Sequence, residues 1–209
     1  MLDVHPPEHR IHGVRDFFLH LFTITIGLLI ALGLEAGVET LHHRHQRNEA
    51  DATIRHELQD NRADVLKSQA ALRIEMKNVL ALMNFLEARS KGQPGNADGV
   101  QFGFSVVPLQ DAAWRTAAST GILSYMDYSR VEKYSAAYKL QDQYETMQQQ
   151  AINGYIKLVS FAVSGQDVKN LSPDQVKASL PAARNTLADL RGMMDVSRGV
   201  IAADDEALK

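Results

Sequence analysis

The chain of 209 residues contains no cysteine, and it has no histidine after His56. Without cysteine, disulfide bonds, thiolate nucleophiles and zinc–thiolate sites are excluded. Without histidine over residues 57–209, histidine-based acid–base catalysis is excluded from most of the chain. The motifs of phosphate-binding loops, α/β-hydrolase nucleophiles and zinc proteases are also missing. We therefore expect a protein that is not an enzyme and carries no cofactor.

An excess of basic residues is also missing. The formal net charge is -3 and the pI is about 6.2. A nucleic-acid-binding domain is usually basic, so we expect no nucleic-acid partner. The chain is 45% hydrophobic and 22% charged, which is the composition of a folded protein and not of a disordered one.

Formally charged residues are missing from residues 17–34, where only three residues are polar. A helix rises about 1.5 Å per residue, so this segment and its flanks cover the roughly 30 Å hydrocarbon layer of a bilayer. The segment is apolar on all sides, whereas the core helix of a globular protein keeps a polar face. A cleaved signal peptide would have a shorter apolar region. The sequence therefore predicts a tail at 1–15 and a single transmembrane helix at 16–38.

Glycine and proline are missing between Gly37 and Gly92, which predicts that the membrane helix continues as a long helix over 39–90. Apolar residues recur there at every seventh position, with two methionines in the alternate turns: Leu58, Val65, Leu72, Met76, Val79, Met83 and Leu86. A repeat of seven favours packing against another helix. We expect a seam inside one helical bundle and not a self-sufficient coiled coil, because the first half of the stripe is sparse.

The remaining sequence predicts a loop at 91–108, a short helix at 109–121, a long helix at 128–163 and C-terminal helices at 173–204. QFGFSVV, in the loop, is either a short strand or an extended segment that plugs the bundle. The apolar stripe of the long helix contains Ala137, Leu140, Tyr144, Met147, Ala151, Tyr155, Leu158 and Ala162.

Capping residues and proline indicate where the last two long helices begin. The long helix is expected to begin near Asp127 or Ser129, and Ser129 and Glu132 have the capping-box spacing. Ser172 and Gln175 flank a first-turn proline, which is typical of a helix start, and Pro181 is expected to restart that helix. The predicted fold class is all-α, with a single transmembrane helix continuing into a long helix that packs in an extramembrane helical bundle over 39–209.

Histidines gather on both sides of the predicted span. On a helix Glu39, His42 and Glu49 lie near one face, and Glu39 and His42 have the Glu-x-x-His spacing of carboxylate-bridged metal sites. With His45, they are the candidate ligands of a divalent metal. A second Glu-x-x-His pair is missing, which favours the alternative, a polar or pH-sensitive membrane flank.

Small residues and one carboxylate mark the predicted span as a helix-packing surface. Thr23, Gly27 and Ala31 precede Glu35 at four-residue spacing, and Gly33 and Gly37 flank it. Small residues permit close contact between membrane helices. In a ring of several copies Glu35 would form a carboxylate ring that favours cations. The favoured alternative is that Glu35 extends to the membrane interface and the glycines only mediate packing.

The first 60 residues carry a family resemblance. IGLLIAL occupies residues 26–32, and Glu49 to Asn61 contains the pattern E-x-x-x-x-I-R-x-E-L-x-x-N. This arrangement resembles a widespread group of uncharacterised bacterial single-pass membrane proteins, which share a short tail and these two motifs. AWRTAASTGILSYMDY, residues 113–128, is similar as well. The resemblance implies a bacterial inner membrane and no particular activity.

The charges that flank the span do not decide the orientation by themselves. Arg10 and Arg15 precede it, whereas Arg44 and Arg47 follow it, so the two sides nearly balance. Long domains cross a membrane largely regardless of their charge, and we therefore expect the C-terminal domain to be periplasmic.

The leading functional hypothesis is a homo-oligomeric, membrane-anchored helical protein that acts as a scaffold, accessory subunit or interaction module. Its expected partners are the lipid bilayer, other copies of itself and another membrane protein. One alternative is a homo-oligomeric ion channel with a Glu35 carboxylate ring. Another is a histidine-based sensor of pH or metal, which is disfavoured because the tail before the span is too short for an output domain.

Overall fold

The structure, a computed structural model, describes residues 13–98 and 100–209. The predicted tail at 1–15 therefore lies mostly outside the described residues. The chain divides into two units, Met1–Asn48 and Glu49–Lys209, and each is described by itself. The described residues form helices joined by irregular segments and contain no strand, so the predicted all-α fold class is confirmed.

The first unit contains the amino-terminal part of α1, which spans Val14–Ser90. Its most apolar 18-residue window is long and apolar enough to cross a membrane, and none of that window is buried. Two hydroxyls inside the apolar segment are satisfied within the helix, because Thr23 Oγ1 donates to the Leu19 carbonyl over 2.9 Å and Thr25 Oγ1 donates to the Leu21 carbonyl over 2.8 Å. Such internal bonds suit a helix in lipid, where water cannot supply a partner.

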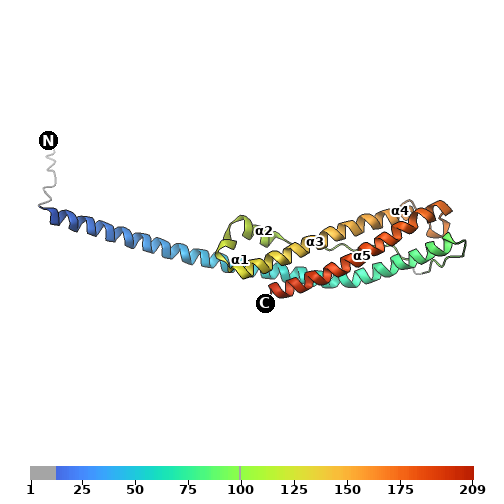
Figure 1. The fold of residues 1–209 in the computed structure, drawn as a ribbon, viewed down its shortest axis with the longest axis horizontal. Helices are drawn as coiled ribbons and strands as arrows, with labels where there is room; N and C mark the ends of the chain where they lie inside the picture. The colour runs from blue at the N-terminus through green and yellow to red at the C-terminus, as the bar shows by residue number, and fades with distance from the viewer. Residues whose placement is uncertain (1–12, 99) are drawn as a thin grey trace, which may run out of the picture. The chain divides into compact units, whose positions relative to one another are not determined.

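The second unit is a three-helix bundle of α1 from residue 49, α3 (Tyr128–Leu158) and α5 (Pro173–Ala207), and Figure 1 shows these helices lying side by side. Helices α1 and α3 are parallel, because Tyr134 contacts Asp51, near the start of the part of α1 that belongs to this unit, and Tyr144 contacts Ser68 farther along α1. Helix α5 is antiparallel to α1.

Two pairs of contacts set this antiparallel direction. Arg62 meets Asp205 near the end of α5, whereas Glu87 meets Arg184 near its start.

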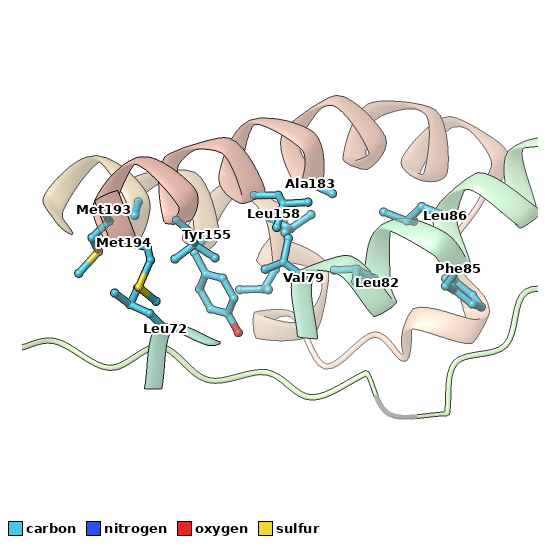
Figure 2. Close-up of a cluster of buried hydrophobic side chains, with 14 of the residues drawn as sticks. Leu72, Val79, Leu82, Phe85, Leu86, Tyr155, Leu158, Ala183, Met193 and Met194 are labelled. Atoms are coloured by element: carbon cyan, nitrogen blue, oxygen red, sulfur yellow. The ribbon is translucent and has the colours of Figure 1, made fainter. Parts of the chain in front are cut away.

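Two apolar clusters form the core of this bundle. The larger one joins α1, α3 and α5, and Figure 2 shows Val79, Leu158 and Ala183 converging in it. The smaller one lies where α2 (Ala112–Ser119) and η1 (Ile122–Tyr125) cover α1 and α3, around Ile54 and Tyr134. The five apolar residues that recur at every seventh position of α1 are all buried, so the predicted bundle seam is confirmed: Leu58, Val65, Leu72, Val79 and Leu86.

A long extended segment connects the end of α1 to α2. We call residues 100–111 the strap; they have no helical or strand structure. Of the two predictions for QFGFSVV, the extended segment is therefore the correct one. The predicted short helix begins only at Ala112, because residues 109–111 still belong to the strap.

Gly95, which lies between α1 and the strap, packs directly against the end of α1. A Cβ added at Gly95 would lie 2.7 Å from Phe85 Cδ2 and 2.9 Å from the Phe85 carbonyl oxygen. Because one of these contacts is with backbone, only glycine fits against the end of α1.

The helix ends correct two expectations and confirm a third. Asp127 caps α3 by accepting from the Ser129 N–H, so of the two predicted starts Asp127 is the correct one and the capping box at Ser129 is not formed. The predicted helix at 128–163 is divided into α3 and the short α4 (Ser160–Val163). The capping box of Ser172 and Gln175 is confirmed, and η2 (Val168–Asn170) precedes it.

Pro181 lies inside α5 and does not restart it. A proline removes one intrahelical hydrogen bond, but Val176 and Ala183 on either side are buried in the core. Their packing keeps the helix continuous to Ala207, beyond the predicted end at 204.

Candidate functional site

The six residues predicted to form an oligomer interface or a pore lie on α1 in the first unit, and all are exposed: Thr23, Gly27, Ala31, Gly33, Glu35 and Gly37. At about 100° per residue, Gly33 lies about 200° around the helix from Ala31. Nothing in the described part of the chain lies within 4 Å of a Cβ added at Gly27, Gly33 or Gly37. Two separate faces with small residues are therefore open to a neighbouring helix.

The four candidate metal ligands are not gathered into one site. The nearest partner of Glu39 is His43, whose Nε2 lies 3.5 Å from Glu39 Oε1, and not His42. No group of three or more histidine, aspartate or glutamate side chains in the described residues is close enough to hold a metal ion. A site at Glu39, His42, His45 and Glu49 stays a prediction that would need ligands from a second chain.

In the second unit, polar side chains of α1 and α3 bind the backbone of the strap. Alternate N–H groups of the strap each donate to a different side chain. These bonds join Gly103 to Tyr155 Oη (2.6 Å), Ser105 to Glu75 Oε1 (2.5 Å), Val107 to Gln148 Oε1 (2.9 Å) and Leu109 to Glu145 Oε1 (3.0 Å). Gln148 also donates from Nε2 to the Val107 carbonyl over 3.1 Å. The strap is thus held through its backbone, and its side chains Val100, Phe104 and Leu109 also pack against the larger apolar cluster.

The strap ends where Glu57 of α1 fixes the start of α2. Glu57 Oε2 accepts from the Ala113 N–H over 2.8 Å, and Oε1 accepts from the Tyr138 hydroxyl over 2.5 Å. A carboxylate at the first turn of a helix satisfies N–H groups that have no helical partner. The Tyr138 ring stacks on Trp114, with centroids 5.3 Å apart and an interplanar angle of 17°. Burial and the bond to Glu57 both raise the pKa of Tyr138, which therefore stays a neutral donor.

Three buried side chains extend this polar layer across the bundle. Asn61 of α1 donates from Nδ2 to Gln141 Oε1 of α3 over 2.8 Å, and Gln141 donates from Nε2 to Asp204 Oδ1 of α5 over 2.9 Å. Asn61 also binds both backbone groups of Gln110 in the strap. We call Asn61, Gln141 and Asp204 the polar relay. It joins all three long helices to the strap.

Two buried acids near the strap have a raised pKa. Burial raises the pKa of Asp204 to about 7, against the opposing effects of the bond from Gln141 and the charge of Arg62. Burial also raises the pKa of Glu75, although the N–H of Ser105 acts in the opposite direction. A carboxyl that loses its hydration inside a protein favours its neutral form. Asp204 can therefore take up a proton well above the usual range of an acid, and Glu75 holds its proton more tightly than an exposed glutamate does.

An open cleft of about 390 Å³ lies over the end of the strap. It is bounded by Gln110 and Asp111 of the strap, Trp114 of α2, and Tyr138 and Gln141 of α3. The cleft thus borders both the polar relay and the Trp114–Tyr138 stack.

The sequence prediction missed the polar layer because it placed the wrong residues of α1 beside the apolar stripe in the core, namely Met76 and Met83. Met76 and Met83 are only half-buried, whereas the row that is buried beside the stripe is Ile54, Asn61, Ser68, Glu75 and Leu82. On α3, likewise, Leu140 and Met147 are half-buried and Gln141 and Gln148 are buried. Asn61, Ser68 and Glu75 recur at seven-residue spacing beside the apolar stripe, and this spacing was the signal that could have identified Asn61 and Glu75 as strap-binding groups.

No protein-family model, curated protein or solved structure matches this chain. The resemblance of the first 60 residues to bacterial single-pass membrane proteins stays a prediction.

Proposed function

We propose that this chain is a single-pass, homo-oligomeric protein of a bacterial inner membrane that acts as a scaffold, accessory subunit or interaction module. The observation that carries the proposal is the complete exposure of the apolar segment of α1. Large apolar side chains from Phe17 to Leu34 are exposed along it. Soluble monomers rarely expose a continuous apolar surface of this length, so lipid or other copies would cover it.

Homo-oligomer formation is supported by the two small-residue faces of α1. A two-fold dimer uses the same face of each copy, whereas a closed ring uses two different faces of each copy. Gly27 and Ala31 belong to one face and Gly33 and Gly37 belong to the other. A ring in which these two faces meet would let helices approach closely on both sides.

Subunit counting of the full chain in lipid nanodiscs, by single-molecule photobleaching, tests this arrangement. Gly27→Leu and Gly33→Leu each place a large side chain on one face. Ile30→Leu conserves volume in the same segment and is the matched control. We expect more than two copies for the wild type and for Ile30→Leu, and fewer copies for each glycine variant. A monomeric wild-type chain, or glycine variants with unchanged counts, would contradict the proposal of homo-oligomers.

The interaction role is proposed for residues 49–209, on the periplasmic side. A phosphatase that is active only in the periplasm, fused after Lys209, should be active in bacteria if this orientation is correct. Affinity purification of the intact chain from crosslinked membranes should then yield a stoichiometric membrane partner that is lost when residues 49–209 are removed.

The channel alternative rests on the position of Glu35, which is exposed next to the apolar segment. A ring of carboxylates at that depth would favour cations. Glu35→Gln should then lower cation conductance in planar bilayers and leave the subunit count unchanged. A wild-type chain that carries no current would exclude the channel and would leave the scaffold proposal standing.

A further inference from the structure

The strap binds the bundle through one edge of its backbone. In an extended chain the N–H and carbonyl groups of successive residues point to opposite edges. Gly103, Ser105 and Val107 donate to side chains of α1 and α3, and the Val107 carbonyl accepts from Gln148. These alternate residues therefore form the edge of the strap that faces the bundle.

The residues between them form a second edge. The N–H and carbonyl groups of Phe102, Phe104 and Val106 have no hydrogen-bond partner among the residues that the structure describes. Phe102 and Val106 are exposed, by 44% and 54%. The row of N–H groups ends at Pro108, because proline has none. We call this edge of residues 102–108 the open edge.

The chemistry of the open edge matches an extended peptide. Its N–H and carbonyl groups recur at every second residue, which is the spacing of the groups that another extended backbone presents. Phe102 and Val106 lie on the same side of the strap, since side chains four residues apart in an extended chain share a side. Apolar side chains of a neighbouring strand would lie beside them.

The strap is already ordered for such a partner. Its other edge is bonded to the bundle, and two of its aromatic rings pack against α3 and α4. The Phe104 ring lies 5.4 Å from that of Tyr155, and the Phe102 ring lies 5.8 Å from that of Phe161, between centroids. A partner that binds a preformed edge loses less free energy to ordering.

The open edge is too short to hold a second folded copy by itself. At about 3.3 Å per residue, the segment from Phe102 to Pro108 covers roughly 20 Å. A stable complex of two folded proteins buries about 1,600 Å² in total, and a single strand of this length provides much less. A short peptide that binds through its main chain fits this edge better.

We propose that the open edge docks a short extended peptide of another protein, which has apolar side chains at alternate positions and adds a strand to the strap. This inference specifies the partner of the interaction module proposed above and rests on that role. The contacts involved belong to the second unit alone. Failure of peptide binding would therefore leave the membrane-anchor and homo-oligomer proposals standing.

A synthetic peptide added to the full chain in lipid nanodiscs tests the docking edge. The probe has seven residues that alternate between threonine and valine. Every second amide is N-methylated, which leaves one edge free to bond and prevents the probe from forming sheets with itself. Hydrogen exchange should show that saturating probe raises the protection of the Phe102, Phe104 and Val106 amides about fivefold. The Val107 amide, which already donates to Gln148, should keep its protection.

A second probe with the same side chains, N-methylated at every residue, is the matched control. Its apolar side chains are unchanged, but the methyl groups block both of its edges. It should leave the three amides unprotected. Equal protection by the two probes would show that only apolar contact holds the peptide and would overturn the proposal. Absence of binding of the first probe at millimolar concentration would overturn it as well.

Two variants test the open edge from the side of the chain. Val106→Pro removes one N–H group and places the proline ring in the edge, so the affinity for the first probe should fall about tenfold. Val106→Thr keeps the N–H group and the branched shape and should bind as the wild type does. Unchanged affinity in Val106→Pro, with Val107 still protected, contradicts the proposal. If Val106→Pro detaches the strap, the comparison of the two probes decides.

The exchange data also identify a second copy as the occupant, if there is one. In that case the amides of the open edge are protected without any probe. Their protection then disappears in nanodiscs that contain a single chain. This result would overturn the proposal of a peptide from another protein.

Discussion

Asn61 and Gln110 are joined by two hydrogen bonds between one side chain and one backbone unit. Asn61 Nδ2 donates to the Gln110 carbonyl over 2.6 Å, and Asn61 Oδ1 accepts from the Gln110 N–H over 2.8 Å. The same Asn61 Nδ2 donates to Gln141. One side chain of α1 therefore connects the strap to the middle of the bundle.

Asn61→Ala should destabilise the bundle by about 2–4 kcal/mol, because the Oε1 atom of the buried Gln141 and both backbone groups of Gln110 lose their bonds to Asn61. The measurement is the midpoint of urea unfolding, followed by circular dichroism. Asn84→Ala, at an exposed position of the same helix, is the matched control and should change the midpoint little. Equal midpoints for the two variants would show that the strap is held by other contacts.

Glu57→Gln should loosen the start of α2. An amide can accept with only one side, so either the Ala113 N–H or the Tyr138 hydroxyl loses its acceptor, at a cost of about 1–3 kcal/mol. Trp114 is the only tryptophan of the chain, and its stacking on Tyr138 gives a specific near-ultraviolet circular dichroism signal. We expect that signal to weaken in Glu57→Gln and to persist in Glu132→Gln, an exposed change on α3. An unchanged signal in both would exclude this role of Glu57.

Stability should fall as pH rises through neutrality. The folded-state pKa of Asp204 is raised to about 7, so the folded protein holds a proton that the unfolded chain has released above its ordinary acid range. The resulting stabilisation is complete below the unfolded pKa and is lost as pH rises through about 7, and it amounts to at most roughly 4 kcal/mol. The raised pKa of Glu75 acts in the same direction.

The midpoint of urea unfolding, measured across this pH range, tests how stability depends on the protonation of Asp204. Asp204→Asn should be more stable than the wild type above neutral pH and should show a flatter pH profile. Asp195→Asn should keep the wild-type profile. A wild-type profile that rises across neutral pH would contradict the burial of an acid at this position.

Gly95→Ala should destabilise the bundle by about 1–3 kcal/mol, since the added methyl group would meet the Phe85 ring and carbonyl oxygen at the end of α1. Gly103→Ala is the control, because a Cβ there meets nothing within 4 Å. Thermal unfolding should show a lower midpoint only for Gly95→Ala. A similar loss in both variants would indicate a general sensitivity of the connecting segment.

The sequence predicted the helices well because helix breakers and repeats of seven are local signals. Leu58 to Leu86 identify the core side of α1, and Ser172 with Gln175 identifies the start of α5. The strap and its binding side chains could not be placed in this way. Glu57, Asn61 and Gln148 are buried because they bind backbone groups that lie far away in the sequence. The seven-residue spacing marks Asn61 and Glu75 as candidates for burial, but no local pattern encodes which backbone group each of them binds.

The central claim is that the apolar part of α1 anchors the chain in a membrane, and alkaline extraction of bacterial membranes tests it most directly. The full chain should stay in the membrane pellet, and a chain that lacks residues 17–34 should be recovered in the soluble fraction with its helical circular dichroism signal intact. Release of the full chain by alkaline extraction would contradict the claim and would mean that protein, not lipid, covers the exposed segment.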